Sequence, residues 1–579
     1  MADAPDATPS PEPAGLPQRA AGLGRNTAIM ASGTLASRLL GFVRNGMLVA
    51  AIGVNAGAAS AYDIANKLPN ALYAVLAAGV INAALVPQIV KAFQRPGGTR
   101  TVDRILTVGT VISFGITVAL TIAAPILVWL YSPTSWPPEL TALATAFALW
   151  CIPQLFFYAI YTLFGQVLNA KEQFGPFMWA PVLNNVIGIA GLGVYLAIFG
   201  PYMLGADNLT GQALTLSWTP FRIGLLAGVA TLGIAAQALI LIWPMLRGGY
   251  RFHWVWRGPK GELAAVRTVV TWALGAVLIE QVGVLWATRV AAAASAAAAE
   301  VSANPGQLDP AIAGNFAYFN ALLIYLLPHS LITVSIVTAL TTSMSRFASA
   351  DDMPGLRGEF SRGVRTIGVF TVFATAVLIV LAPSLTRIIA PTSLPVEVTS
   401  ISHIVIAFAI GLVPLGAMVL MKRVYFVLED ARSIFFIHIP MTIVWIAIAS
   451  LSRELLQPMW WVVGVAFGMS MSNVTGVVLR ARGMHRRLGG LDGRRVAKTH
   501  AKAIVGALAA GGAGWALSQT LPDPVALVDA AGLIAGLLNV ALVGTVMAIV
   551  YGSVLWLLRT PELNEVMSPV TGRLRRRVR

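Results

Sequence analysis

The sequence predicts an all-α membrane protein with about 14 transmembrane helices, arranged as two parallel six-helix lobes around a central cavity and followed by two C-terminal helices. Composition is the first observation: 57% of the 579 residues are hydrophobic and 11% are charged, and the mean hydropathy is +0.75, outside the range of soluble domains. Second, apolar runs of roughly 20 to 30 residues, each able to cross about 30 Å of hydrocarbon as a helix, recur along the chain. The expected spans cover residues 26–54, 60–94, 102–131, 139–169, 176–199, 220–246, 263–297, 312–348, 360–389, 397–428, 433–452, 456–481, 499–519 and 529–559.

The third observation is an internal repeat, because short motifs of the first half recur in the second half in the same order, offset by about 260 residues. Six spans separate the two copies, so both halves have the same orientation and are related by an axis along the membrane normal. Such repeats place a transported substrate between the halves. The matched positions are Leu68 and Pro69 of "LPNAL" with Leu327 and Pro328 of "LPHSL", Pro153 with Pro414, Val167 with Val427, and Pro181 with Pro440.

The spans and the repeat divide the chain into five expected segments. Residues 1–25 are polar and rich in Pro and Ala, so we expect a disordered cytoplasmic tail without the apolar region of a signal peptide. Residues 26–250 form the N-lobe with helices 1–6, and residues 251–490 form the C-lobe with helices 7–12. Residues 491–560 form the C-terminal helix pair, and residues 561–579 form a basic cytoplasmic tail.

The positive charge follows the membrane topology. The formal charge is +16, but 33 of the 40 Lys and Arg residues lie in or border alternate loops and the termini, whereas the loops of the opposite side contain or border only Arg387 and Arg453. By the positive-inside rule, both termini are cytoplasmic in a multi-pass protein of the cytoplasmic membrane. Anionic lipid headgroups then account for the basic excess, and nucleic acid is not expected as a partner. The single cysteine, Cys151, lies in a span, which excludes disulfides and leaves it a structural role.

Apart from the basic residues that border the loops, five lie within the spans, where an Arg at mid-depth costs about 2.5 to 3.5 kcal/mol. These residues are Arg38, Arg44, Lys67, Arg222 and Arg289. Arg222 is near a loop and can extend its head to the membrane surface. Arg38 and Arg44 are too deep for both to do so, and their span contains no carboxylate. They are separated by about 120° around the helix, so a bend at Gly41 or a wide cavity would bring both onto one wall.

Two polar stripes accompany these arginines. In the second span Asp63, Asn66, Lys67, Asn70 and Tyr73 recur at spacings of three and four, and Asp63 with Lys67 also fits a mutually neutralising pair. Pro69 in the same span frees a backbone carbonyl, which a polar cavity tolerates. The second half offers one polar stripe in the seventh span and another in the eighth. The two tyrosines of these stripes fit equally well as residues of the apolar core, and the histidine fits a residue that only packs against a neighbouring helix. The residues of these stripes are Glu280, Gln281, Arg289, Asn315, Tyr318, Tyr325 and His329.

Together the stripes predict a water-filled cavity with net positive charge between the two lobes. Guanidinium groups without matching carboxylates favour an anion, and their planar forks suit the oxygens of a diphosphate. We expect Arg38, Arg44, Lys67 and Arg289 to bind such a group. No metal site, cofactor or catalytic residue is expected, and no glycine-rich nucleotide loop is found.

Three stretches resemble the MurJ (MviN) lipid II flippase family of the multidrug/oligosaccharidyl-lipid/polysaccharide exporter superfamily: "SRLLGFVRN", "NKLPNALYAVLAAGVINAALVPQIVKAF" and "PQLFFYAIYTLFGQVLNAKEQFGPFMWAPVLNN". The resemblance implies fourteen helices, a cationic cavity between two lobes, and a last helix pair that forms a groove for the lipid tail. It also implies that the protein is a transporter rather than an enzyme. Its activity would be the export of undecaprenyl-diphosphate-linked peptidoglycan precursor from the inner to the outer leaflet by alternating access.

The resemblance also carries residue and partner expectations. Arg38 and Arg44 match the family's paired arginines, and Lys67, Pro69 and Asn70 match its "KLPN" motif. We expect a monomer in contact with lipid II, membrane lipids and proteins of cell-wall synthesis, with a role in cell shape. Where the family often has charged residues, this chain has neutral ones, which leaves Arg289 to supply charge from the second lobe. These departures are Ser60, Tyr73, Ala74, Ala78 and Leu323.

Other functions remain open at this point. A flippase for another polyprenyl-diphosphate-linked glycan would need the same cavity, whereas a drug or cation antiporter would need more carboxylates in it. A membrane enzyme acting on such lipids should have acidic clusters in large loops, but the acidic doublet Asp351 and Asp352 lies among basic residues and fits a solvated loop. A scaffold would have no reason to keep unpaired arginines in a span.

Overall fold

The computed structural model describes residues 16–76, 98–171, 173–203, 209–256, 267–302 and 308–562, and this part of the chain is helical without any strand. It contains 12 helices long and apolar enough to cross a membrane, or up to 13 if a bent pair is one span. The second expected span is described only as α2 (Gly57–Leu76), and the rest of it lies outside the described residues. The all-α polytopic fold is therefore confirmed, and the expected number of fourteen spans stays a prediction.

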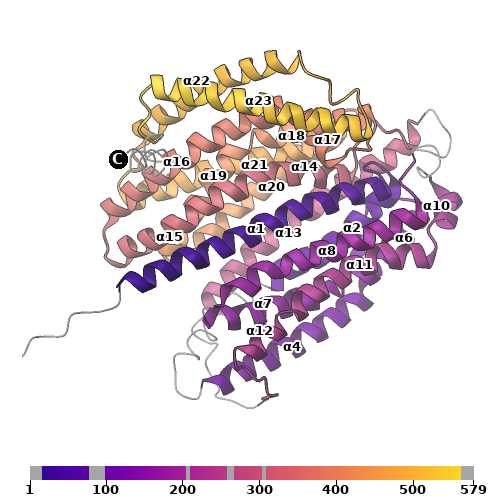
Figure 1. Ribbon diagram of the computed structural model, residues 1–579, viewed down its shortest axis with the longest axis horizontal. Coiled ribbons are helices and arrows are strands. Elements are labelled where there is room, and N and C mark those ends of the chain that lie inside the picture. The colour runs from indigo at the N-terminus through magenta and orange to yellow at the C-terminus, as the bar shows by residue number, and fades with distance from the viewer. Residues whose placement is uncertain are drawn as a thin grey trace, which may run out of the picture.

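The helices form two groups that lie side by side in Figure 1. We call the first group the N-terminal bundle: α1 (Leu16–Ile52), α2, α4 (Thr99–Ile122), α5 (Ala124–Tyr131), α6 (Pro138–Cys151), α7 (Gln154–Ala170), α8 (Phe174–Phe199), α10 (Gly211–Ser217), α11 (Pro220–Leu239) and α12 (Ile242–Arg247). The C-terminal bundle comprises α13 (Arg267–Glu300), α14 (Asn315–Pro328), the π-helical turn η3 (His329–Thr333), α15 (Val334–Ser349), α16 (Met353–Val380), α17 (Ala382–Ile389), α18 (Pro395–Ala409), α19 (Leu412–Val427), α20 (Ala431–Leu455) and α21 (Pro458–Leu488). The C-terminal helix pair, α22 (Gly493–Ser518) and α23 (Asp529–Leu557), packs mainly on α16 and α17.

Breaks in the helices recur at matching places in the two bundles. The junction of α4 with α5 has its counterpart between α16 and α17, and a proline occupies the first turn after each junction. The junction of α6 with α7 contains Pro153, and its counterpart between α18 and α19 bends by 44° near Gly411. Other prolines, such as Pro69 and Pro181, lie inside helices that continue through them. Matching breaks support the internal repeat that the sequence predicts.

The helix at the N-terminus begins earlier than expected. We expected disorder up to residue 25, but α1 starts at Leu16. Its first turns, "LPQRAAGLGRN", are rich in good helix formers, with proline near the start where it is tolerated. Residues 1–15 of the expected tail and residues 563–579 of the basic tail lie outside the described residues.

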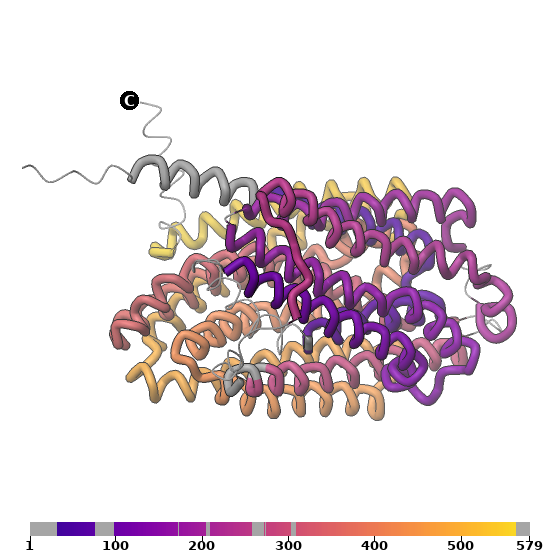
Figure 2. Tube along the Cα trace, turned by 90° about the horizontal axis from the view of Figure 1, so that it is seen from below, coloured from indigo at the N-terminus to yellow at the C-terminus, as the bar shows by residue number. Residues whose placement is uncertain are grey.

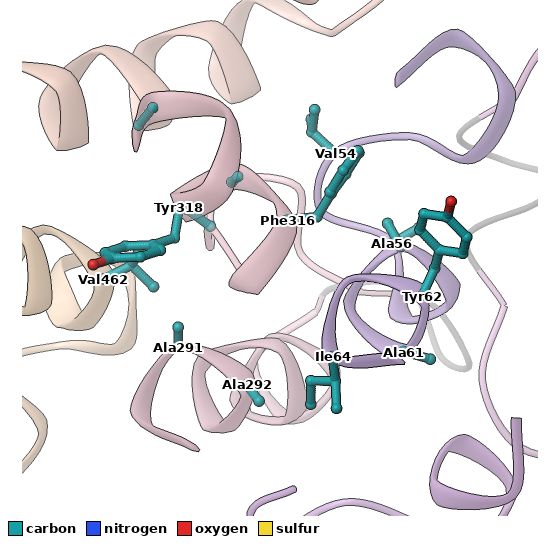
Figure 3. Packing of buried hydrophobic residues seen from close by; sticks show 14 of the residues in the cluster. Val54, Ala56, Ala61, Tyr62, Ile64, Ala291, Ala292, Phe316, Tyr318 and Val462 are labelled. Carbon is teal, nitrogen blue, oxygen red and sulfur yellow. The ribbon is translucent and has the colours of Figure 1, made fainter. Parts of the chain in front are cut away.

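The two bundles meet in one buried apolar cluster. Figure 3 shows side chains of α2, α13 and α14 gathered there, among them Ile64, Ala292, Phe316 and Tyr318. Ile64 is completely buried, and Phe316 is 1% exposed. Small alanines on α13 allow α2 to approach closely, which is the usual way for helices to pack in membranes. The contact lies where α1 ends and α2 begins, and we call this level the closed end.

Candidate functional site

A cavity of about 320 Å³ lies between the two bundles, beneath the closed end. Its volume falls in the range of roughly 300 to 1,000 Å³ typical of small-molecule sites. Helices α1, α2 and α8 supply one side and α14 supplies the other. The lining residues are Arg38, Gly41, Phe42, Arg44, Asn45, Leu48, Tyr62, Asp63, Asn66, Asn185, Phe316, Phe319, Leu323, Leu326 and Leu327.

Both arginines of α1 line this cavity, although α1 is a continuous helix through Gly41. A wide cavity, rather than a break in the helix, therefore admits both guanidinium groups. The Arg44 Nη1 atom lies 3.4 Å from Asn184 Oδ1. The stem of Arg44 crosses α8 at Gly188, where an added Cβ would come within 2.5 Å of Arg44 Cδ. Glycine at this position gives Arg44 the room to reach the cavity wall.

Among the residues that the structure describes, the opposite wall adds no carboxylate to balance Arg38. His329, in the π-helical turn of the C-terminal bundle, lies near Arg38. Among the described residues that line the cavity, Asp63 is the acidic one. Its carboxylate is already paired with Lys67, whose Nζ lies 2.5 Å from Asp63 Oδ2. The cavity therefore keeps the charge of two guanidinium groups for a ligand.

Lys67 lies at the junction of the two bundles. Its Nζ donates to Asn315 Oδ1 at 3.1 Å, and it lies 5.6 Å from the ring centre of Tyr318. Asp63 and Lys67 thus form the neutralising pair that the sequence allowed, with Asn315 as an additional partner across the bundles. Lys67 contributes to the closed end in this conformation rather than to the free charge of the cavity.

Further polar pairs join the bundles at the closed end. Asn45 donates to Asn320 Oδ1 at 2.5 Å, and the hydroxyl oxygens of Ser60 and Ser295 lie 2.8 Å apart. Asn55 Nδ2 also donates to the carbonyl of Pro310 at 2.8 Å. Sequence reasoning missed these residues, because single Ser and Asn side chains in a span carry no signal of their partners in the other half. The Asn184–Asn185 pair ended one of the quoted motifs but was not recognised as part of the site.

Arg289 does not supply charge to the cavity in this conformation. Its Nη1 atom lies 3.4 Å from the carbonyl oxygen of Leu130, at the end of α5, and it is absent from the described lining residues. At this position α13 lies beside α5, and the side chain of Arg289 turns to that helix. Our expectation that Arg289 joins Arg38 and Arg44 is therefore not met here.

The remaining predicted site residues divide between the cavity and the packing. Asn66 lines the cavity, while Asn70 donates to the carbonyl of Asn66 at 3.2 Å. The Tyr73 hydroxyl bonds with Thr162 inside the N-terminal bundle.

In the C-terminal bundle, Tyr318 and Tyr325 both pack on Phe408, which is the core role considered above. Glu280 is exposed on α13, and the side-chain oxygen of Gln281 is buried without a hydrogen-bond partner.

Three further arginines, which are not among the expected site residues, are buried. Arg387 and Arg480 are completely buried, and Arg365 is 7% exposed and paired with Glu562. Arg222, expected to reach the membrane surface, donates to the hydroxyl of Tyr195 at 2.7 Å and lies over the Trp218 ring. Hydropathy does not distinguish a buried arginine near a helix end from a solvated one, because both are flanked by loops.

No cluster of metal-binding side chains occurs in the part of the chain that the structure describes. The fold, and a cavity between two bundles that is lined by Arg38 and Arg44, are those of a multi-pass membrane transporter. The chain matches the family model "Lipid II flippase MurJ" over residues 48–531. It belongs to the MurJ family of lipid II flippases.

A relative by sequence agrees with this assignment, and two solved structures share the fold. "Probable lipid II flippase MurJ" of Haemophilus influenzae is 26% identical over 504 residues, covering 83% of this chain and 90% of the relative. The solved structure "Lipid II flippase MurJ, inward closed conformation" is similar in fold, with a TM-score of 0.65, 16% identity and coverage of 92% of this chain and 99% of that one. An inward-facing multidrug transporter of the MATE family is similar with a TM-score of 0.60 and 13% identity, covering 79% of this chain and 95% of that one.

Proposed function

We propose that this protein exports lipid II from the inner to the outer leaflet, and that Arg38 and Arg44 bind the diphosphate of this lipid in the central cavity. The observation that carries the proposal is a cavity lined by two guanidinium groups without a free carboxylate. Planar guanidinium forks match diphosphate oxygens, and the low dielectric of a membrane cavity strengthens such pairs. The proposal places the protein in the cytoplasmic membrane as a monomer with both termini in the cytoplasm, working beside proteins of cell-wall synthesis.

The closed end suggests which side the cavity opens to. With the orientation given by the basic loops, α1 runs outward and the closed end faces the cell exterior. The polar pairs at Ser60, Asn45 and Lys67 then close the outer side, and the cavity is reached from the cytoplasm. Export follows when these pairs separate and the two bundles, acting as the N-lobe and C-lobe, rock to open outward.

A second, apolar site fits the lipid tail. A groove of about 320 Å³ lies between α16, α19 and α22, and His500 is at its edge. Its walls are almost entirely aliphatic, including Val372, Ile379, Ile504 and Leu508. We propose that part of the prenyl chain lies in this groove while the diphosphate occupies the cavity, because a long polyprenyl chain stays in an apolar environment throughout transport.

The membrane potential is the proposed driving force. Moving an anion outward across an inside-negative membrane is favoured by about 2.3 kcal/mol per charge per 100 mV. A coupling ion is the alternative, and dissipating the potential in vesicles separates the two: flipping that continues unchanged would rule out the potential.

Complementation of cells depleted of their own flippase tests the function. Wild type should restore growth, whereas Arg38→Ala and Arg44→Ala should not, because each removes half of the diphosphate site. Arg453→Ala, at an exposed arginine far along the chain on α20, is the matched control and should restore growth. Rescue by both cavity variants would refute the diphosphate site. Failure of wild type to rescue would favour another polyprenyl-diphosphate-linked glycan as the substrate.

A further inference from the structure

A second groove lies on the N-terminal bundle, away from the central cavity. It has a volume of about 270 Å³ and is bounded by α4, α7, α11, α12 and the chain that follows α12. An apolar cavity of about 150 Å³ is known to hold a benzene molecule, so this groove has room for several methylene groups. The helical part of its wall is aromatic and aliphatic, with Phe156, Phe157, Ile160, Phe164 and Leu239 among the lining residues.

The outer edge of the groove is formed by an extended segment, residues 250–256, which we call the strap. Figure 2 shows an extended stretch of chain crossing the neighbouring helices at this part of the sequence. The strap has the sequence "YRFHWVW", in which every second residue is aromatic. In an extended backbone alternate side chains share a face, and accordingly Tyr250, Phe252 and Trp254 all line the groove.

The strap is fastened to α4 by three contacts. The Tyr250 hydroxyl donates to Asp103 Oδ1 at 2.5 Å, and His253 Nδ1 lies 3.5 Å from Asp103 Oδ2. One turn further along α4, the backbone N–H of Val255 donates to the Thr107 hydroxyl oxygen at 3.1 Å. Burial, with the hydrogen bond and charge of Asp103, raises the pKa of Tyr250, so this hydroxyl remains a donor at physiological pH. The strap therefore runs from the start of α4 towards the middle of this membrane-spanning helix.

The strap leaves much of its aromatic surface uncovered. Trp254 is 59% exposed and Trp256 is 61% exposed, although their rings stack with centroids 6.4 Å apart. Tryptophans at this level of a membrane protein lie in the interfacial zone, between the headgroups and the acyl chains. A fixed irregular segment at this depth exposes an apolar groove directly to lipid chains.

Three basic residues adjoin residues that line the groove. Lys171 lies over the Tyr250 ring, Arg247 stacks on Trp243 and follows the lining residue Leu246 in the chain, and the exposed Arg251 lies between Tyr250 and Phe252 in the strap. Asp103 is the acidic neighbour of the strap, but it is 5% exposed and accepts from the Tyr250 hydroxyl, so Lys171, Arg247 and Arg251 outnumber it at this end of the bundle. Anionic lipids of the cytoplasmic leaflet attract such positions by about 1 kcal/mol per basic residue near the surface.

We infer that this groove is a binding site for a single anionic phospholipid of the cytoplasmic leaflet, with one acyl chain under the strap and the headgroup against Arg251, Arg247 and Lys171. The bound lipid fills the space between the strap and α7 and stabilises the cytoplasmic end of the N-terminal bundle. None of the residues that line the groove lines the central cavity. The site is therefore distinct from the one proposed for lipid II.

The two tryptophans of the strap give a matched test. Trp254 lines the groove and Trp256 does not, although both are similarly exposed. Native mass spectrometry of the full chain, titrated with phosphatidylglycerol or with neutral phosphatidylethanolamine, measures retained lipid. We expect Trp254→Ala to weaken the tightest phosphatidylglycerol binding about tenfold and Trp256→Ala to change it less than threefold. Arg251→Gln should reduce the preference for phosphatidylglycerol over phosphatidylethanolamine.

A second variant tests the groove without a substitution in the strap, so its result does not depend on the folding of the strap. Thr110→Trp fills the groove from α4 without altering the strap, and should also abolish the tight binding. Equal binding by wild type, Trp254→Ala and Thr110→Trp would overturn the site, as would equal retention of the two lipids by wild type. Displacement of the bound phosphatidylglycerol by undecaprenyl phosphate at equal concentration would assign the groove to the substrate tail and overturn the proposal. Rescue of growth by Trp254→Ala, together with lost lipid binding, would separate this site from the export function.

Discussion

The hydroxyl oxygens of Ser60 and Ser295 lie 2.8 Å apart across the junction of the N-terminal and C-terminal bundles. Ser60 is completely buried and Ser295 is 2% exposed, so the pair is sealed from solvent in this conformation. Ser60 lies on α2 of the N-terminal bundle, and Ser295 lies on α13 of the C-terminal bundle. If export requires the closed end to open, these two oxygens must separate in every transport cycle.

A disulfide between these positions should stop transport. Replacing both residues in a Ser60→Cys/Ser295→Cys variant places two sulfur atoms near the S–S bonding distance of about 2.05 Å after a small shift. We expect oxidation to lock the closed end and abolish flipping in vesicles, and reduction to restore it. The native Cys151 is buried and does not compete. Each single cysteine variant is the control, and undiminished flipping by the cross-linked protein would show that the closed end is not a gate.

Gly314→Ala should have the opposite effect on the same contact. A Cβ at position 314 would lie 2.2 Å from Ser295 Oγ and 2.9 Å from Ser60 Oγ, so the contact between the two hydroxyls has to shift to admit it. We expect a cysteine at position 60 to react faster with a membrane-impermeant maleimide added from outside when Gly314→Ala is present. Gly115→Ala is the control, because nothing lies within 4 Å of the Cβ it would add. An unchanged labelling rate would mean that the clash is relieved locally.

Asn315→Asp should strengthen the closed end. Lys67 Nζ already contacts Asp63 and lies 3.1 Å from Asn315 Oδ1, so a carboxylate at 315 adds a charge-assisted bond across the bundles. We expect flipping to slow about tenfold, because the added bond has to break before the exterior side opens. In a double-mutant cycle, Lys67→Met should remove most of the effect of Asn315→Asp. Additive effects of the two substitutions would exclude their direct coupling.

Much of this arrangement follows from the sequence, and the limits of prediction have a physical reason. Hydropathy and the spacing of Arg38, Arg44 and Asp63 predict an all-helical fold and a polar cavity wall, because these patterns depend on residues close together in the chain. The pairing of Ser60 with Ser295 depends on how two bundles pack, which local periodicity does not contain. Arg289 was misplaced for this reason, since the depth of a residue along its helix does not reveal which neighbour its side chain meets.

The stability of the protein should depend on pH through Asp430, outside the membrane-spanning helices. Its carboxylate caps α20 by accepting from the backbone N–H of Ser433 at 3.0 Å and pairs with Arg487. Partial burial raises the pKa of Asp430, but the hydrogen bonds from Ser433 and the charge of Arg487 outweigh it and hold the pKa below its ordinary value of 3.8. A lowered pKa means that the stabilisation is complete above the ordinary value and is lost as the pH falls through the lower, folded-state value.

Asp430→Asn isolates this effect, because asparagine still caps the helix but carries no charge. We expect wild type to unfold at a higher temperature than Asp430→Asn at pH 7, and the difference to shrink as the pH falls below the ordinary pKa of 3.8. Unfolding followed by tryptophan fluorescence in detergent measures both proteins across this range. A difference that persists unchanged in acid would show that the charge of Asp430 does not contribute.

Arg387→Met should loosen the C-terminal helix pair and, with it, the groove proposed for the lipid tail. The completely buried guanidinium donates to the carbonyls of Pro524 at 2.8 Å, Val525 at 3.0 Å and Pro391 at 3.0 Å, and so ties the chain between α22 and α23 to the end of α17. Its removal leaves these carbonyls buried without a donor, at a cost on the order of 3 kcal/mol. We expect a lower unfolding temperature and faster proteolysis of the α22–α23 connection. Arg453→Met, at the exposed arginine of α20, should change neither, because a solvated arginine leaves no buried acceptor behind.

The same substitution should affect transport, because α22 forms one wall of the groove proposed for the lipid tail. We expect Arg387→Met to weaken lipid II export more than the loss of folded protein explains. An activity that falls only in proportion to the amount of folded protein would confine Arg387 to a structural role.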